Sequence, residues 1–192
     1  MDMKSLYERA NTLIKPNEPF NEYNSIIIPV MLADNEIDKD NEMISQNALI
    51  NLLNFSIGHS AIISIPEIYD NIIRGRIIHS EIVHTDKYNS ANIPYEYIKS
   101  YVILRKLGWY SNIVSELIAM NGKMLKTSIS FSLLHRHCSI CYCDRLKNKC
   151  CHTKGNYYND SKNLCYHIIS DVADIYECAI CYPFEIVQCN YQ

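Results

Sequence analysis

Cysteine and histidine side chains gather between residues 138 and 165 with the spacing of a metal site. The stretch contains the pairs Cys138-x-x-Cys141 and Cys150-x-His152, followed by Cys165. Two thiolates separated by two residues can bind one ion, because the turn between them presents both sulfurs to the same side. The second pair can then complete a tetrahedron. The sequence therefore predicts a structural Zn²⁺ site with Cys138, Cys141, Cys150 and His152 as ligands, and with Cys165 as the alternative fourth ligand.

Further thiols and imidazoles leave alternatives open at this site. Cys143 and Cys151 lie in the same stretch, and His137 is a substitute for His152, although its place next to Cys138 is sterically less suitable. Redox use of the thiols is a second alternative. A third is burial, because free cysteine behaves as a small hydrophobic residue in protein cores. We expect burial for the cysteines of the C-terminal apolar run, which are Cys178, Cys181 and Cys189.

The composition limits the class of protein. With 192 residues, of which 48% are hydrophobic, the chain can form one domain with a proper core and a small insert. A net charge of −3 gives no electrostatic reason for binding nucleic acid or an anionic membrane. No apolar run approaches the roughly 20 residues that span a bilayer. Nine cysteines, an odd number, and the lack of a signal sequence favour a reducing cytoplasm over a disulfide framework.

The pattern of apolar residues predicts an α+β domain built on a β-barrel or folded sheet, with a few short helices. We expect an N-terminal arm over residues 1–24 with no more than a helical turn, a domain over residues 25–192, and a cysteine-rich insert over residues 135–166. Ser45 is typical of a helix N-cap, and the apolar stripe after it predicts a helix through Phe55. A second helix is expected from Ser111 to Ala119. The expected strands cover residues 25–32, 61–65, 76–83, 95–105, 125–134 and 176–187.

Four segments carry a likeness to a known family. The first is Asp38-Lys39-Asp40-Asn41-Glu42 ahead of an amphipathic helix, and the second is Gly75-Arg76-Ile77-Ile78-His79-Ser80-Glu81-Ile82-Val83. The third and most specific is Ser128-Ile129-Ser130-Phe131 leading into the cysteine stretch. The fourth is Asp174-Ile175-Tyr176-Glu177 before an apolar strand. With these segments the chain resembles, over about residues 25–187, the prohead (head maturation) proteases of tailed phages, in the subgroup with a cysteine-rich insert.

This resemblance implies a serine protease with the herpesvirus-assemblin type of fold, which trims scaffold and capsid proteins inside the immature phage head. It assigns the nucleophile to Ser128 and the acidic residue to Glu177. A serine hydroxyl needs an imidazole to take its proton, and a carboxylate can hold that imidazole in the right tautomer. The implied place is the cytoplasm of a phage-infected or lysogenic bacterial cell. The implied partners are capsid and scaffold proteins, with neither nucleic acid nor membrane, and a homo-oligomer is compatible with them.

The family's histidine has no direct counterpart in this sequence. Counting back from Arg76 without gaps places Ile65 in the histidine position, and isoleucine cannot accept a proton. His59 precedes Ile65 by six residues, about 20 Å along a strand, so it replaces the missing histidine only if the loop is re-registered. We therefore expect a protease homologue that has lost its activity. The alternative is a capsid-assembly or scaffold-binding protein that keeps the fold and the zinc site. A small zinc-binding interaction module unrelated to phage heads is a more distant third.

Overall fold

Segments rich in Ile, Val and Leu build a mixed α+β structure in which six strands close into a barrel. The computed structural model describes residues 1–63, 73–106, 124–159 and 162–180. Its elements in chain order are α1 (Met3–Ile14), β1 (Ser25–Asp34), β2 (Glu42–Ile44), α2 (Gln46–Ser56), β3 (Ser60–Ile63), β4 (Ile73–Tyr88), β5 (Pro94–Arg105), β6 (Leu125–Cys138), β7 (Tyr157–Tyr158), β8 (Asn163–Leu164) and β9 (His167–Ile180).

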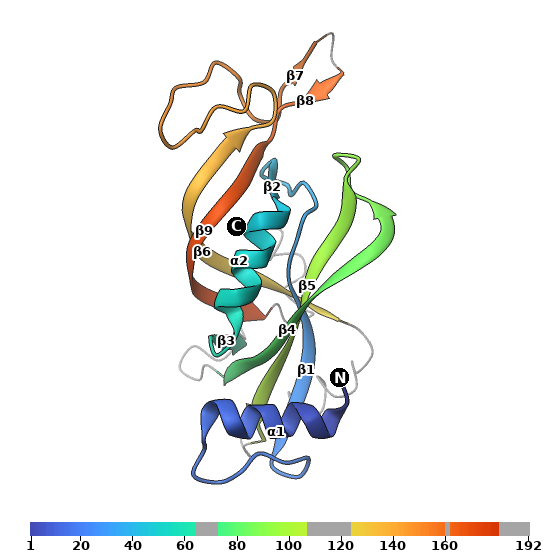
Figure 1. Cartoon of the computed structure of the whole chain (residues 1–192), viewed down its shortest axis with the longest axis vertical. Helices are drawn as coiled ribbons and strands as arrows, with labels where there is room; N and C mark the ends of the chain where they lie inside the picture. The colour runs from blue at the N-terminus through green and yellow to red at the C-terminus, as the bar shows by residue number, and fades with distance from the viewer. Residues whose placement is uncertain (64–72, 107–123, 160–161, 181–192) are drawn as a thin grey trace.

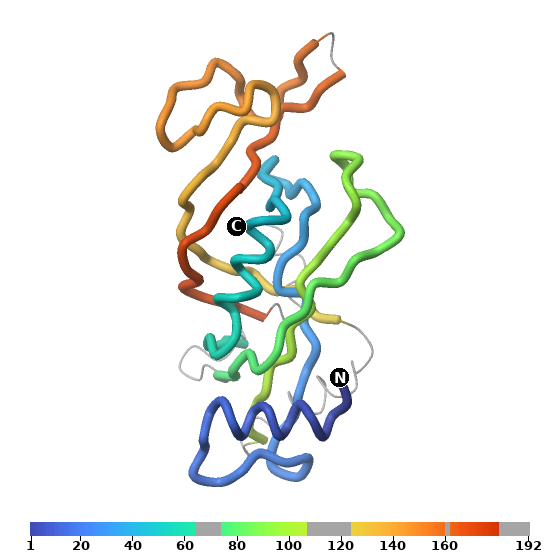
Figure 2. The backbone as a smooth tube through the Cα atoms, viewed as in Figure 1, coloured from blue at the N-terminus to red at the C-terminus, as the bar shows by residue number. Residues whose placement is uncertain are grey.

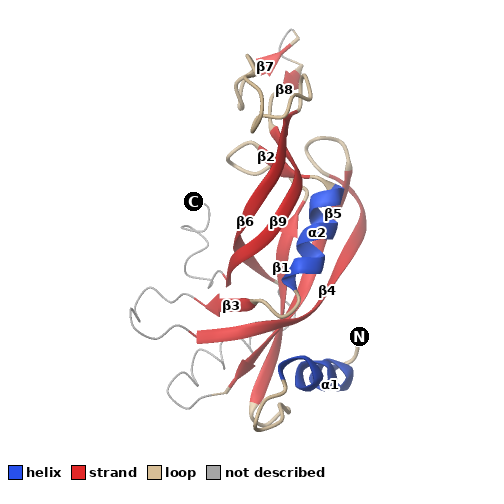
Figure 3. Cartoon of the chain, turned by 60° about the vertical axis from the view of Figure 1, so that its left-hand side comes forward, coloured by secondary structure: helices blue, strands red, loops and turns tan. Residues whose placement is uncertain are grey.

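The barrel closes because its first and last strands pair with each other. The order around it is β9, β3, β4, β5, β1 and β6, and β6 returns to β9. The pairs β1–β6 and β3–β9 are parallel, and the other barrel pairs are antiparallel. Helix α2 packs against β9, β4 and β5, as Figures 1 and 3 show. The predicted α+β class with a β-barrel is confirmed at this level.

Alternation along β5 separates the interior of the barrel from its surface, as the sequence predicts. Ile98 and Val102 are buried in the main core, whereas Tyr97, Lys99 and Tyr101 on the other face are half-buried. Residues of a strand point alternately to opposite faces, so this pattern follows directly from the period of two. The main core also contains buried side chains from the other barrel strands and from α2, among them Ile28, Val30, Leu32, Leu49, Leu52, Ile63, Ile77, Val172 and Ile175.

Helix α2 begins where the sequence predicts. The Ser45 hydroxyl accepts a hydrogen bond from the Ala48 backbone N–H at 3.2 Å, which satisfies one of the free donors of the first turn. Ala48, Leu49 and Leu52 then point into the barrel core and are fully buried. Strands β1, β3 and β5 lie close to where they are expected, whereas β4 extends beyond 76–83 at both ends, β6 extends beyond Leu134, and β9 begins nine residues before Tyr176. The predicted helix at 111–119, Ile65 and the last residues of the predicted C-terminal strand lie outside the described residues.

The N-terminal segment corrects the sequence prediction of a loose arm. It forms the 12-residue helix α1, which Asp2 caps by accepting a hydrogen bond from the Ser5 N–H at 2.8 Å. Leu6 and Ala10, one helical turn apart, are buried against Ile78 in a second, smaller core beneath the barrel. Tertiary packing of this short apolar stripe therefore adds to the favourable helix propensity of residues such as Leu6, Glu8 and Ala10.

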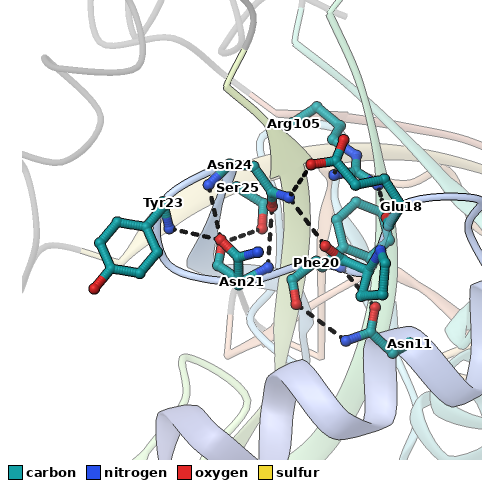
Figure 4. A network of polar contacts seen from close by, with 9 residues as sticks. Asn11, Glu18, Phe20, Asn21, Tyr23, Asn24, Ser25 and Arg105 are labelled. Atoms are coloured by element: carbon teal, nitrogen blue, oxygen red, sulfur yellow. Dashed lines mark hydrogen bonds and ion pairs between the residues drawn. The ribbon is translucent and has the colours of Figure 1, made fainter.

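The loop after α1 is tied to the helix and to the sheet by side-chain hydrogen bonds (Figure 4). The Asn11 amide donates to the Phe20 carbonyl at 3.0 Å and accepts from the Phe20 N–H at 2.7 Å. Asn24 donates to Glu18, and Arg105 at the end of β5 donates to the Glu18 carbonyl. The loop with Pro16 and Pro19 is therefore a defined connection between α1 and β1.

The β6–β9 hairpin carries the cysteine-rich insert away from the barrel (Figures 1 and 2). Cross-strand pairing continues as far as Cys138 and His167, so β6 contains residues 135–138 of the predicted insert, and β9 begins well before Tyr176. The insert is thus the connection over residues 139–166, with the small β7–β8 sheet inside it. It lies at the opposite end of the molecule from α1. Within the described ranges, no helix is long and apolar enough to cross a membrane.

Candidate metal centre

The first cysteine pair is placed by a tight turn at the end of β6. The Cys138 N–H donates to the Cys143 carbonyl at 3.1 Å, and the Cys138 carbonyl accepts from the Tyr142 N–H at 2.9 Å. Tyr142 has a φ of 57°, a left-handed conformation that reverses the chain. This turn brings Cys141 back toward Cys138, as expected for two thiols separated by two residues.

The second pair meets the first at the tip of the hairpin. The ligand atoms of Cys138, Cys141, Cys150 and His152 all lie within 4.8 Å of one another. The Cys141 and Cys150 sulfurs are 3.5 Å apart, and the Cys150 sulfur lies 3.5 Å from His152 Nδ1. The four residues predicted from spacing are therefore brought together, and they can hold one metal ion.

Backbone N–H groups point at two of the four ligands. The Ile140 N–H donates to the Cys138 sulfur and the His152 N–H donates to the Cys150 sulfur, each at 3.4 Å. Desolvation raises the pKa of the Cys150 thiol, but hydrogen bonds from the His152 N–H and from the neighbouring thiols outweigh it and bring this pKa to about 5. Thiolates, not thiols, bind metal ions, so these N–H groups support the charge state that binding requires.

Contacts outside the four ligands fix the two chain segments of the site. Arg145 Nη1 donates to the Cys150 carbonyl at 2.8 Å, which fastens the second pair to the turn of the first. The His152 ring meets the Tyr158 ring edge-on, with centroids 4.7 Å apart. Because Tyr158 belongs to β7, the small β7–β8 sheet orients the imidazole. Groups that hold the ligands in this way are typical of metal centres in proteins.

Cys165 lies beside the site without belonging to the four-residue group. Its sulfur is 3.9 Å from the Cys138 sulfur, close to the roughly 3.8 Å edge of a tetrahedron with Zn–S bonds of about 2.3 Å. Both thiols are fully buried. Desolvation and the hydrogen bond with Cys138 raise the pKa of Cys165 to about 11, which favours the neutral thiol. The convergence of the other four ligand atoms within 4.8 Å, which does not include Cys165, favours His152 as the fourth ligand.

The remaining cysteines separate by environment. Cys151 is exposed and Cys143 is half-exposed next to the site, and desolvation together with the neighbouring thiols raises the pKa of Cys143 to about 12. Cys178 is fully buried in the barrel core, as the sequence predicts. Every cysteine that the structure describes is a free thiol. Cys181 and Cys189 lie outside the described residues.

The predicted serine and glutamate share the outer face of the barrel but are not paired directly. Ser128 and Glu177 are both exposed, and the register places Glu177 opposite Ser130 and places Ala179 opposite Ser128. Over the described ranges, Ser128 makes no hydrogen bond to an imidazole. His59, at the start of β3, instead lies 3.9 Å from the Asp174 carboxylate. The triad of Ser128, His59 and Glu177 thus stays a prediction.

Sequence reasoning missed a second group of polar side chains next to the metal centre. His135 and His137 lie on β6, and Asp171 lies opposite His135 on β9. The signal is the His-x-His spacing, which puts two imidazoles on one face of a strand. It was overlooked because the strand was expected to end at Leu134, so that the histidines were assigned to the insert.

Comparisons of the chain with family models, with curated proteins and with solved structures gave no match. The resemblance to the prohead proteases therefore stays a prediction that rests on the four sequence segments.

Proposed function

We propose that the insert is a structural zinc knuckle. The observation that carries this proposal is the convergence of Cys138, Cys141, Cys150 and His152 within 4.8 Å. Three thiolates and one imidazole are a set that Zn²⁺ prefers, and a full set of four protein ligands leaves no position for substrate. The ion would hold together an insert whose large apolar side chains Tyr142, Leu146 and Tyr157 are exposed, and which therefore has little core of its own.

We further propose that the whole chain is a degenerate prohead-protease homologue, with an assemblin-like barrel, that binds scaffold or capsid proteins without cleaving them. Two features of the described residues support this proposal over catalysis. Ser128 lacks a bond to an imidazole among the described residues, and the nearest registered partner of Glu177 is Ser130. A serine without a neighbouring base is a weak nucleophile. The family resemblance is the basis for proposing phage scaffold and capsid proteins as the partners, and the immature head as the place where the chain binds them.

An active protease is the second candidate, because His59 lies close to the relevant strands. It directly precedes β3, and β3 runs parallel to β9 with Ala61 beside Cys178, the neighbour of Glu177. Hydrogen bonds of catalytic groups are often long before substrate binds, so a rearranged Ser128–His59 pair is compatible with this arrangement.

A combined binding and cleavage assay tests both candidates. The purified chain is mixed with the recombinant scaffold and major capsid proteins of the same source genome, and complex formation and proteolysis are followed together. If the chain is a degenerate homologue, we expect a stable complex with intact partner proteins, and we expect the same complex with Ser128→Ala. Cleavage that disappears in Ser128→Ala but not in the matched variant Ser130→Ala establishes the second candidate instead. Absence of both binding and cleavage contradicts the capsid role and leaves the zinc knuckle to be judged by its metal content.

A further inference from the structure

An open cavity of about 330 Å³ lies between α2 and the β6–β9 hairpin, next to the metal centre but separate from its ligands. Six of its seven lining residues have polar side chains, and each of the three elements contributes. The lining residues are Asn47, Ile50, Asn51, His135, His137, Ser170 and Asp171. None of them belongs to the four-residue cysteine and histidine group or to the predicted triad.

The two histidines lie near the end of β6, where the hairpin leaves the barrel. Earlier on β6, Ile129, Phe131 and Leu133 pack against the barrel core. The pairing with β9 is irregular between Ser130 and Arg136, and beyond Leu133 the residues His135 and His137 line the cavity together with residues of α2. Because neighbouring residues of a strand point to opposite faces, Cys138 is directed to the other side. The strand therefore keeps the imidazoles and the cysteine ligands apart.

Each imidazole is held through its Nδ1 atom, which leaves Nε2 for a ligand. His135 Nδ1 donates to the Asp144 carboxylate at 2.8 Å, and His137 Nδ1 lies 2.5 Å from the Ser170 hydroxyl. The hydrogen bond from His135 lowers the pKa of the Asp144 carboxyl to about 2, so the carboxylate is charged at neutral pH. A carboxylate behind a histidine is the arrangement that fixes the tautomer and the ring orientation of metal-binding imidazoles.

The carboxylate of Asp171 lines the same cavity. Its Oδ1 atom accepts hydrogen bonds from the Asn51 amide at 2.6 Å and from the Val172 N–H at 2.9 Å, which leaves Oδ2 for a ligand. The register places Asp171 directly opposite His135. Two imidazoles and one carboxylate that line one cavity, each held by a neighbour, are a typical ligand set for divalent transition metals with open coordination positions.

We propose that His135, His137 and Asp171 form a second metal site, for an exchangeable divalent transition-metal ion, in the cavity between α2 and the β6–β9 hairpin. The two rings are nearly parallel, at 20°, with centroids 6.1 Å apart. Imidazoles that share one ion through Nε2 at about 2.0–2.1 Å have centroids about 5 Å apart, and both ring planes pass through the ion. The rings must therefore approach by about 1 Å and turn, and the Asp171 carboxylate must turn toward the same ion. Three protein ligands leave positions open for water or substrate, unlike the closed site at the insert tip.

Calorimetric titration of the zinc-loaded protein with Ni²⁺ tests this proposal. We expect one Ni²⁺ to bind per chain without release of Zn²⁺, which a zinc-sensitive dye reports in the same samples. His135→Asn and His137→Asn should each abolish this binding or weaken it at least tenfold. Asp144→Asn removes the negative charge that lies behind His135 and also pairs with Lys147, and should weaken Ni²⁺ binding by about 10–100-fold.

The matched control is His84→Asn, because His84 also pairs with a carboxylate, Glu96 at 2.7 Å, but lies outside the cavity. This variant should bind Ni²⁺ like the unmodified chain. If a variant fails to fold, nuclear magnetic resonance of the unmodified protein replaces it. Paramagnetic Ni²⁺ should then broaden the ring signals of His135 and His137 and leave those of His84 unchanged. Displacement of Zn²⁺, no bound Ni²⁺, or broadening centred on other residues would overturn the proposal. None of these results depends on protease activity or on capsid proteins.

Discussion

Cys138 is the residue at which the barrel and the insert meet. It is the last residue of β6, it is fully buried, and its sulfur belongs to the four-residue group. The N–H of Ile140 and the neighbouring thiol of Cys165 both contact this sulfur. A change at Cys138 therefore affects the metal site and the end of the hairpin together. Cys141, which is exposed, is the better position for a test of metal binding alone.

A chain of three buried hydroxyl groups offers a test inside the barrel. Ser80 Oγ lies 2.8 Å from both Ser56 Oγ and Ser100 Oγ, and all three serines are buried. Ser80→Ala leaves Ser100 without this partner in the core, so we expect a loss of about 1–3 kcal/mol in the free energy of unfolding. Urea denaturation measures the change. The exposed Ser130→Ala should stay within about 0.5 kcal/mol, and equal effects of the two variants would contradict the account.

At the scale of elements, the sequence predicted what depends on local pattern. The metal ligands followed from spacing, α2 followed from Ser45 and its apolar stripe, and β5 followed from approximate alternation. Helix α1 was not predicted, because its apolar stripe of Leu6 and Ala10 is short and its packing partner Ile78 is distant in sequence. The true start of β9 at His167 was missed for a similar reason: only its pairing with Cys138 reveals it.

The α1 interface gives a prediction about pH. Burial lowers the pKa of His79, and Arg9 of α1 and the N-terminus lower it further against a weaker opposing effect of Glu81. Below about pH 6.5 the unfolded chain therefore binds a proton that the native state resists. The contribution of His79 to the free energy of unfolding should be fully present above about pH 6.5 and should be lost as the pH falls toward the native pKa of His79. Unfolding free energies measured between about pH 7.5 and pH 5 should show this slope.

His79→Phe keeps a ring that can stack on Tyr101, as the imidazole does at a centroid distance of 5.9 Å, but removes the titrating group. The slope over this pH range should become shallower in the variant. Parallel pH profiles for the two proteins would show that His79 does not report on the docking of α1.

At the scale of the whole molecule, the two ends have different sources of stability. The barrel has a continuous apolar core that includes α2, and α1 covers a second core at one end. The insert at the other end exposes Tyr142 and Tyr157 and depends on its turn contacts and on the proposed ion. Lys154 of the insert also pairs at 3.0 Å with Glu42, the first residue of β2, a partly exposed contact that adds little by itself.

Removal of the metal should therefore separate the two ends. With a strong chelator, backbone amides over residues 139–166 should lose protection from hydrogen exchange, whereas β4 and β5 should keep theirs. Exchange followed by mass spectrometry resolves the two regions. Loss of protection throughout the chain would mean that the ion also stabilises the barrel, and unchanged protection of the insert would mean that it needs no ion.

The most direct test of the account is the zinc content of the purified protein after dialysis against a weak chelator. We expect one Zn²⁺ per chain in the unmodified protein and in Cys151→Ser, whose thiol lies outside the four-ligand group, and a large loss of zinc in Cys141→Ser. A folded, zinc-free protein whose Cys138, Cys141 and Cys150 thiols all react freely would contradict the account.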